Sequence, residues 1–113
     1  MPKRRVSLAE AEKLSRLFSI NHHVVPFDQW VFGLNIELEH GTRNPITDVT
    51  GDDLILTAKI TLAHLMEFPN YYEKLEQMED TLDKEWRGRI KGSPITPSYV
   101  SPKISKSPKS YKK

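Results

Sequence analysis

Apolar residues recur at intervals of three and four positions in four separate stretches of the chain, which predicts four helices. The first helix begins after Ser7, since Ser7 and Glu10 have the spacing of a capping box. The second helix has Asp28 as its expected cap and Gly41 as its expected stop. The apolar stripes are Ala11, Leu14, Leu17 and Phe18 in the first helix, and Phe27, Trp30, Val31, Leu34 and Leu38 in the second.

The third predicted helix is apolar on almost every side. Thr50 is its expected cap, two aspartates follow in the first turn, and Phe68 and Pro69 end it. Because such a helix is normally buried on all sides, we expect the other helices to surround it. A fourth helix begins at Asn70 as its cap and ends with Trp86, which we expect to be a core residue like Trp30. We therefore predict an all-α fold, a small bundle of about four helices.

Composition divides the chain into three parts and limits what it can do. Residues 1–6 form a basic N-terminal arm, residues 7–91 the helical bundle, and residues 92–113 an extended basic tail rich in Ser, Pro and Lys. With 113 residues and 37% hydrophobic residues, the chain forms one domain that is too small to enclose a large substrate pocket. The absence of cysteine excludes thiol chemistry, disulfides and cysteine-ligated zinc.

No segment has the pattern of a signal peptide or a membrane span. The basic start is not followed by an apolar run, and the stretch 60–66 is too short to cross a bilayer. We expect a soluble protein that is not secreted, located in the virion if it is viral and otherwise in the cytoplasm or nucleus.

Charge is segregated along the chain. Residues 6–86 contain all 15 acidic residues and six basic ones, a net charge of −9. The N-terminal arm contributes Lys3, Arg4 and Arg5, and the tail contributes five lysines without an acidic residue. An acidic body with basic ends is typical of a protein whose ends contact an acidic partner, although charged ends also serve solubility alone.

Two Glu/His pairs are the strongest candidates for chemistry. Glu37 and His40 lie three residues apart on the second predicted helix, and His64 and Glu67 do so on the third, so each pair shares one helix face. Glu-x-x-His motifs on facing helices hold divalent metals such as iron or manganese in carboxylate-bridged bundles, but here the second pair runs in reverse order. A buried hydrogen-bond network without metal is the preferred alternative, and Tyr71, Tyr72 and Glu79 are further possible partners in it. We predict no catalytic residue, and we interpret His22 and His23 as surface or capping residues.

The tail contains a six-residue repeat, SPKISK followed by SPKSYK. It places Lys103, Lys106, Lys109 and Lys112 at every third position, and Lys113 ends the chain. In a polyproline II conformation these lysines would follow one edge at intervals of about 9 Å. Ser-Pro-Lys repeats resemble the tails of linker-histone-like proteins, so the pattern indicates contact with a polyanion, DNA included.

Three dense motifs resemble a family of small uncharacterised helical proteins found in bacteria and in large double-stranded DNA viruses. The motifs are ELEHG at 37–41, TDVTGDD at 47–53 and AHLMEFPNYY at 63–72. Members of the family often have Gly where Ala58 stands and Asp where Asn70 stands. The resemblance supports a helical fold and implies no established activity.

These observations lead to one expected function and two alternatives. We expect a non-enzymatic structural or interaction protein, a minor capsid or virion component of a large DNA virus, anchored by its basic arms to other structural proteins of the assembly. The first alternative is a DNA-binding or DNA-condensing protein that acts through the SPK-repeat tail. The second is a small helical metal-binding protein or enzyme that uses Glu37, His40, His64 and Glu67.

Overall fold

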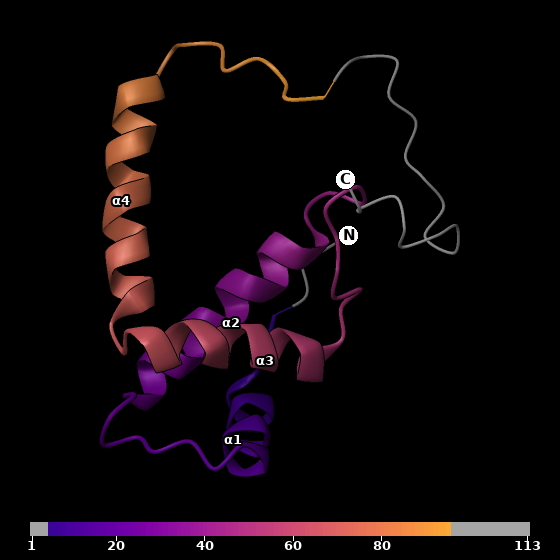
Figure 1. Cartoon of the computed structure of the whole chain (residues 1–113), viewed down its shortest axis with the longest axis vertical. Helices are drawn as coiled ribbons and strands as arrows, with labels where there is room; N and C mark the ends of the chain where they lie inside the picture. The colour runs from indigo at the N-terminus through magenta and orange to yellow at the C-terminus, as the bar shows by residue number, and fades with distance from the viewer. Residues whose placement is uncertain (1–4, 96–113) are drawn as a thin grey trace.

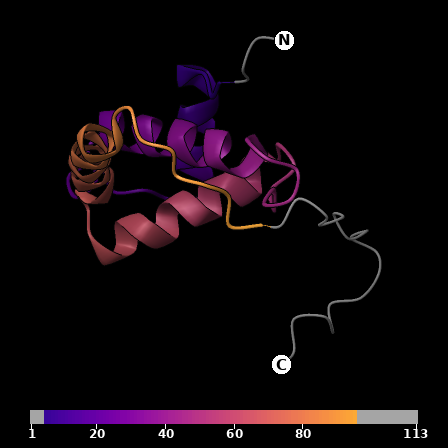
Figure 2. The same ribbon diagram turned by 90° about the horizontal axis from the view of Figure 1, so that it is seen from above.

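A computed structural model describes residues 5–95 of the chain. Its four helices confirm the predicted all-α fold (Figure 1): α1 (Leu8–Leu17), α2 (Phe27–Thr42), α3 (Leu54–Glu67) and α4 (Tyr71–Trp86). Helix α2 is the central element because α1, α3 and α4 each pack against it, and α3 also contacts α4. In the view from above, α3 lies beside α2 at an angle to it, and α4 stands at one end of both helices (Figure 2).

The start of α1 is the predicted capping box. The Ser7 hydroxyl accepts a hydrogen bond from the Glu10 backbone N–H at 3.1 Å, and the Glu10 carboxylate accepts one from the Ser7 N–H at 2.9 Å. Val6, which the sequence placed in the N-terminal arm, is buried, and its N–H donates to the Asn35 side chain on α2 at 2.7 Å. These bonds fix the entry into α1 against α2.

The predicted caps of the next two helices were wrong. Pro26 occupies the N-cap position of α2, so Asp28 falls inside the first turn. There its negative charge still stabilises the helix by interacting with the positive end of the helix dipole. Asp53, not Thr50, caps α3, because its carboxylate accepts from the backbone N–H groups of both Ile55 and Leu56, at 2.8 and 3.0 Å. Asn70 holds the N-cap position of α4 as predicted, but its side chain makes no capping hydrogen bond.

Gly41 does not end α2, which continues for one more residue. Its function in the fold is close packing, since a Cβ at this position would collide with the hydroxyl of Thr50. Thr50 is 5% exposed, and its hydroxyl has no hydrogen-bond partner among residues 5–95. The loop between α2 and α3 is therefore packed directly on the end of α2.

The core lies between α1, α2 and the inner face of α3. Trp30 is its largest member, completely buried, and the indole N–H donates to the Ala11 carbonyl at 3.0 Å, which ties α2 to α1. The buried apolar residues are Val6, Ala11, Leu14, Val25, Trp30, Leu34, Leu38, Ala58, Leu65 and Tyr72.

Helix α3 is not surrounded by the other helices, contrary to the prediction. One face is buried, through Thr57, Ala58, Thr61 and Leu65, and it packs on α2. The opposite face is open, with Met66 76% exposed and Ile55 47% exposed. Four helices of this length supply neighbours for one side of α3 only, so much of its apolar surface is left in contact with water.

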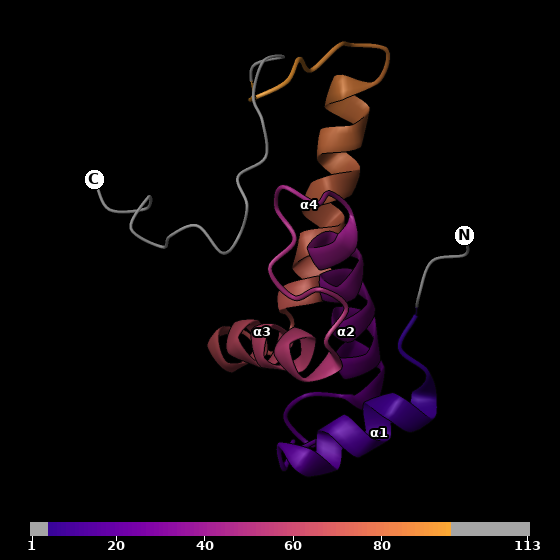
Figure 3. The same cartoon turned by 90° about the vertical axis from the view of Figure 1, so that its right-hand side faces the viewer.

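Helix α4 also departs from the prediction. Its first turn packs into the body, but its C-terminal half extends beyond the other helices (Figures 1 and 3). Trp86 is consequently 39% exposed rather than a core residue, and Met78 and Leu82 are 52% and 41% exposed. Among the described residues, no helix combines the length and apolar character needed to cross a membrane.

Candidate functional site

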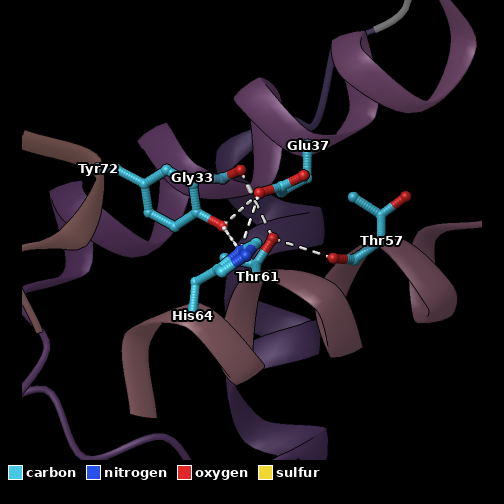
Figure 4. A network of polar contacts seen from close by, with 6 residues as sticks. All are labelled: Gly33, Glu37, Thr57, Thr61, His64 and Tyr72. Atoms are coloured by element: carbon cyan, nitrogen blue, oxygen red, sulfur yellow. Dashed lines mark hydrogen bonds and ion pairs between the residues drawn. The ribbon is translucent and has the colours of Figure 1, made fainter. Parts of the chain in front are cut away.

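Tyr72 lies at the junction of three helices. The residue lies in the first turn of α4, and its side chain is completely buried over Gly33 of α2 and near Thr61 of α3. A Cβ at Gly33 would lie 2.6 Å from Cε2 of the Tyr72 ring, so only glycine leaves room for the ring against the α2 backbone. The Thr61 hydroxyl donates to the Thr57 carbonyl at 2.9 Å, which satisfies this buried group within α3 (Figure 4).

One carboxylate and one imidazole meet at the Tyr72 hydroxyl. The hydroxyl donates to Oε2 of Glu37 at 2.7 Å, and Nδ1 of His64 lies 3.1 Å from both that carboxylate oxygen and the Tyr72 oxygen (Figure 4). Each helix of the junction contributes one residue: Glu37 from α2, His64 from α3 and Tyr72 from α4. We call this group the junction triad.

The hydrogen-bond pattern places two protons of the junction triad, one on Tyr72 and one on His64. The single proton of Tyr72 points to Glu37, so both oxygen atoms near Nδ1 of His64 are acceptors. We therefore assign a proton to Nδ1, which leaves Nε2 either as a free lone pair or as a second N–H. The Glu37 side chain is 11% exposed and the His64 side chain 35% exposed, so the carboxylate lies inside and the imidazole reaches the surface.

The environment of Tyr72 keeps its hydroxyl protonated. Burial raises the pKa of Tyr72 far above its usual value of 10.0, and the hydrogen bond to Glu37 raises it further. A neutral hydroxyl remains a donor at every pH at which the protein is normally handled. The junction triad thus contains a permanent donor directed at a nearly buried carboxylate.

Tyr71 holds the imidazole from its other side. The rings of His64 and Tyr71 are stacked, with centroids 4.4 Å apart and an interplanar angle of 2°, and the rings of Tyr71 and Tyr72 meet edge to face. An imidazole oriented by a carboxylate at one nitrogen can use the other nitrogen to accept a proton or to bind one metal ion. The chemistry available at this site is therefore that of a single oriented histidine.

The other two predicted metal ligands are not part of the triad. Glu67 is exposed at the end of α3, and His40 lies half-buried on α2, one turn beyond Glu37. Within residues 5–95, no three or more His, Asp or Glu side chains gather in a group that could hold a metal ion. Metal binding by the four residues stays a prediction, and the structure brings together only Glu37 and His64.

The structure also joins Ser15 and His22, which the sequence did not connect. Nε2 of His22 lies 2.6 Å from the Ser15 hydroxyl, and Nδ1 lies 2.8 Å from the Val25 carbonyl. The carbonyl can only accept, so Nδ1 carries a proton, and in the neutral imidazole the Ser15 hydroxyl donates to Nε2. Both residues line an open hollow of about 1010 Å³ beside α1. The seven-residue separation across a turn gives no periodic signal, so sequence patterns alone could not reveal this pair.

Most of the basic residues predicted to bind a partner lie outside the described residues. These are Lys3, Arg4, Lys103, Lys106, Lys109, Lys112 and Lys113. Arg5 is described and its side chain is exposed. Binding of a polyanion or a protein by the arms stays a prediction.

The fold and the site define a class: a small all-α protein whose helices α2, α3 and α4 meet at a carboxylate, an imidazole and a buried tyrosine. The chain belongs to a family described as proteins of unknown function (DUF5661), whose model matches residues 10–81 and so includes the whole junction triad. No curated protein and no solved structure matches the chain. The family assignment agrees with the predicted membership of an uncharacterised family.

Proposed function

We propose that the protein is a non-enzymatic interaction protein that docks onto another protein through the open side of α3. The observation that carries this proposal is the set of apolar side chains on that side. Met66 is 76% exposed, Phe68 61%, Ile55 47% and Leu56 42%. Together with the exposed Ala63, these residues form what we call the α3 outer face: Ile55, Leu56, Ala63, Met66 and Phe68.

The α3 outer face has the character of an interface. Exposed apolar residues are common singly, but a contiguous group along one helix is typical of a binding surface. Burying one large apolar side chain contributes about 1.5–3 kcal/mol, so covering several of them can support specific association. Met66 also borders a second hollow of about 360 Å³, which is lined mainly by apolar residues of the α1–α2 loop and α3. A partner side chain inserted there would extend the contact beyond α3.

The proposed partners are structural proteins of a larger assembly, and the specific proposal is a minor component of the capsid of a large DNA virus. The sequence resemblance to proteins of such viruses supports this choice. The basic residues at the two ends of the chain, Lys3, Arg4 and Arg5 together with the tail lysines, would supply a second anchor on an acidic surface. In this arrangement the α3 outer face provides most of the affinity, and the arms provide attraction that weakens with salt.

Cross-linking mass spectrometry of purified virus particles tests the proposal. Lys59 is exposed between Ile55 and Ala63 on the open side of α3, so an amine-reactive reagent should link it to a capsid protein. Replacing Met66 with Asp should abolish incorporation into particles. The matched control is Leu8→Asp, which places the same charge at another exposed apolar residue, 66% exposed on α1, and should leave incorporation intact. Purified particles that lack the protein, or that retain the Met66→Asp variant, would contradict the proposal.

A second candidate function, DNA binding, rests on the lysine spacing in the tail. Contacts made by lysine with phosphate would weaken steeply as salt rises. Deleting residues 101–113 should therefore abolish a salt-sensitive mobility shift with duplex DNA. An unchanged shift after the deletion would remove this candidate.

A further inference from the structure

Helix α4 has an apolar stripe whose C-terminal part is covered by no other helix of the described chain. Leu75 packs partly on the core, but Met78, Leu82 and Trp86 continue the same stripe at helical spacing beyond the body and are 52%, 41% and 39% exposed. Figures 1 and 3 show the reason: the C-terminal half of α4 extends past the other helices. The remaining faces of this half are polar, so the stripe is the surface through which it can associate.

Charge is as asymmetric as polarity along α4 and the five residues that follow it, 87–91. The segment 73–80 contains Glu73, Glu76, Glu79 and Asp80 against one lysine, a net charge of −3. The segment 84–91 contains Lys84, Arg87, Arg89 and Lys91 against one glutamate, a net charge of +3. Arg89 is held beside the end of the helix, where it donates to the Glu85 carbonyl and stacks over Trp86.

We propose that α4 pairs with α4 of a second copy of this chain in antiparallel orientation, with Leu82 at the two-fold axis. In this register Met78 of one copy packs against Trp86 of the other. Each basic end, which consists of Lys84 and the residues just past the helix, then lies near the acidic segment of α4 in the other copy, so opposite charges meet twice.

Antiparallel pairing is favoured over parallel pairing for two physical reasons. Parallel helices would place each acidic segment against the other acidic segment and each basic segment against the other basic one. They would also bring both bodies to the same end of the pair, where α2 and α3 already pack against the first turn of α4. Antiparallel helices place the two bodies at opposite ends and leave the projecting halves to overlap. The α3 outer face takes no part in the pair, so this inference stands apart from the proposed function.

Sedimentation equilibrium of the full chain gives the first test. We expect a dimer of the 13.1 kDa chain that dissociates on dilution. Leu82→Asp brings two carboxylates together at the axis and should weaken dimerisation about 100-fold or more. The control, Gln77→Asp, adds the same charge to an exposed residue on the opposite side of α4 and should change the dissociation constant less than about threefold. A monomer at all accessible concentrations, or a dimer that Leu82→Asp does not weaken, would overturn the proposal.

A second test of the dimer reverses charges on residues that lie outside the packed body. Arg87→Glu combined with Arg89→Glu should weaken the dimer about tenfold or more, and adding Glu76→Lys and Glu79→Lys in the same chain should restore it. Circular dichroism at low concentration checks that each variant keeps its helices. Failure of the second pair to restore dimerisation would contradict the proposed register.

Disulfide trapping tests the orientation, because the chain contains no cysteine and an introduced one is unique. In the antiparallel pair, Leu82→Cys should cross-link with itself. Met78→Cys should cross-link with Trp86→Cys in a mixture of the two variants, and neither should cross-link with itself. Gln77→Cys, on the opposite side of the helix, is the control that should stay uncross-linked. Self-cross-linking of Met78→Cys would show parallel pairing and refute the antiparallel assignment.

Discussion

Replacing Tyr72 with Phe is the most direct test of the junction triad. The substitution removes one oxygen atom and keeps the ring that fills the space over Gly33. It deletes the 2.7 Å hydrogen bond to Glu37, whose carboxylate is 11% exposed. A hydrogen bond to a charged group contributes about 1.5–3 kcal/mol. Since His64 still contacts the carboxylate, we expect a loss of about 2 kcal/mol in the free energy of unfolding, and a melting temperature lower by about 10 °C for a domain of this size.

The same variant has a characteristic dependence on pH. The pKa of Tyr72 is raised in the folded protein, so above pH 10 the tyrosine ionises in the unfolded chain but stays protonated in the folded one. The contribution of the Tyr72 hydroxyl to the free energy of unfolding is therefore fully present below pH 10. It falls by about 1.4 kcal/mol per pH unit as the pH rises above that value. Phe does not titrate. The stability difference between the wild type and Tyr72→Phe should consequently shrink above pH 10.

Urea unfolding followed by circular dichroism between pH 7 and pH 11 measures both effects. The control is Tyr71→Phe, because the Tyr71 ring stacks on His64 while its hydroxyl makes no hydrogen bond in the part of the chain that the structure describes. This control should stay within about 0.5 kcal/mol of the wild type and keep the wild-type response to alkali. A Tyr72→Phe variant that is as stable as the wild type at pH 7 and equally sensitive to alkali would refute the triad as described.

Three further measurements test other parts of the fold. Gly33→Ala should lower stability by about 1–3 kcal/mol in thermal unfolding, because the collision with the Tyr72 ring outweighs the gain in helix propensity of about 1 kcal/mol; a stabilised variant would contradict the packing. Asp53→Ala should lower the free energy of unfolding by about 1 kcal/mol, because the helix loses its cap. Thr50→Val removes a buried unpaired hydroxyl and should be neutral or stabilising. If urea unfolding gave the opposite ranking of the two variants, Thr50 would be the cap after all. Elemental analysis tests the predicted metal site: the triad as a hydrogen-bond network predicts no stoichiometric metal, and a metal lost on His64→Ala would overturn that.

Features that depend on neighbouring residues in the chain could be predicted from the sequence. The capping box of Ser7 and Glu10 was confirmed because both hydrogen bonds join groups three residues apart. The cap of α3 was predicted at the wrong residue for a related reason. Thr50 and Asp53 are both good caps, and the choice depended on Thr50 being drawn into the packing against Gly41.

Features that depend on how helices meet could not be predicted in the same way. Glu37 and His64 were singled out by their spacing within each helix, but their contact, and the exclusion of Glu67 from it, follow from how α3 lies on α2. Tyr72 was expected only as one possible partner among several. Tyr72 donates to Glu37 beside His64 because its ring packs closely on Gly33, and no periodic pattern records this close approach.

The sequence by itself determined the number of helices, the α1 cap, the charge segregation and most of the core residues, because periodicity and local hydrogen bonding act over a few residues. The tertiary structure alone decided which apolar stripes are covered. Trp86 and the outer residues of α3 have the same pattern as core residues, yet they are exposed, because four short helices cannot enclose every apolar face. Whether an apolar side chain becomes core or interface depends on the neighbours that the rest of the chain can supply.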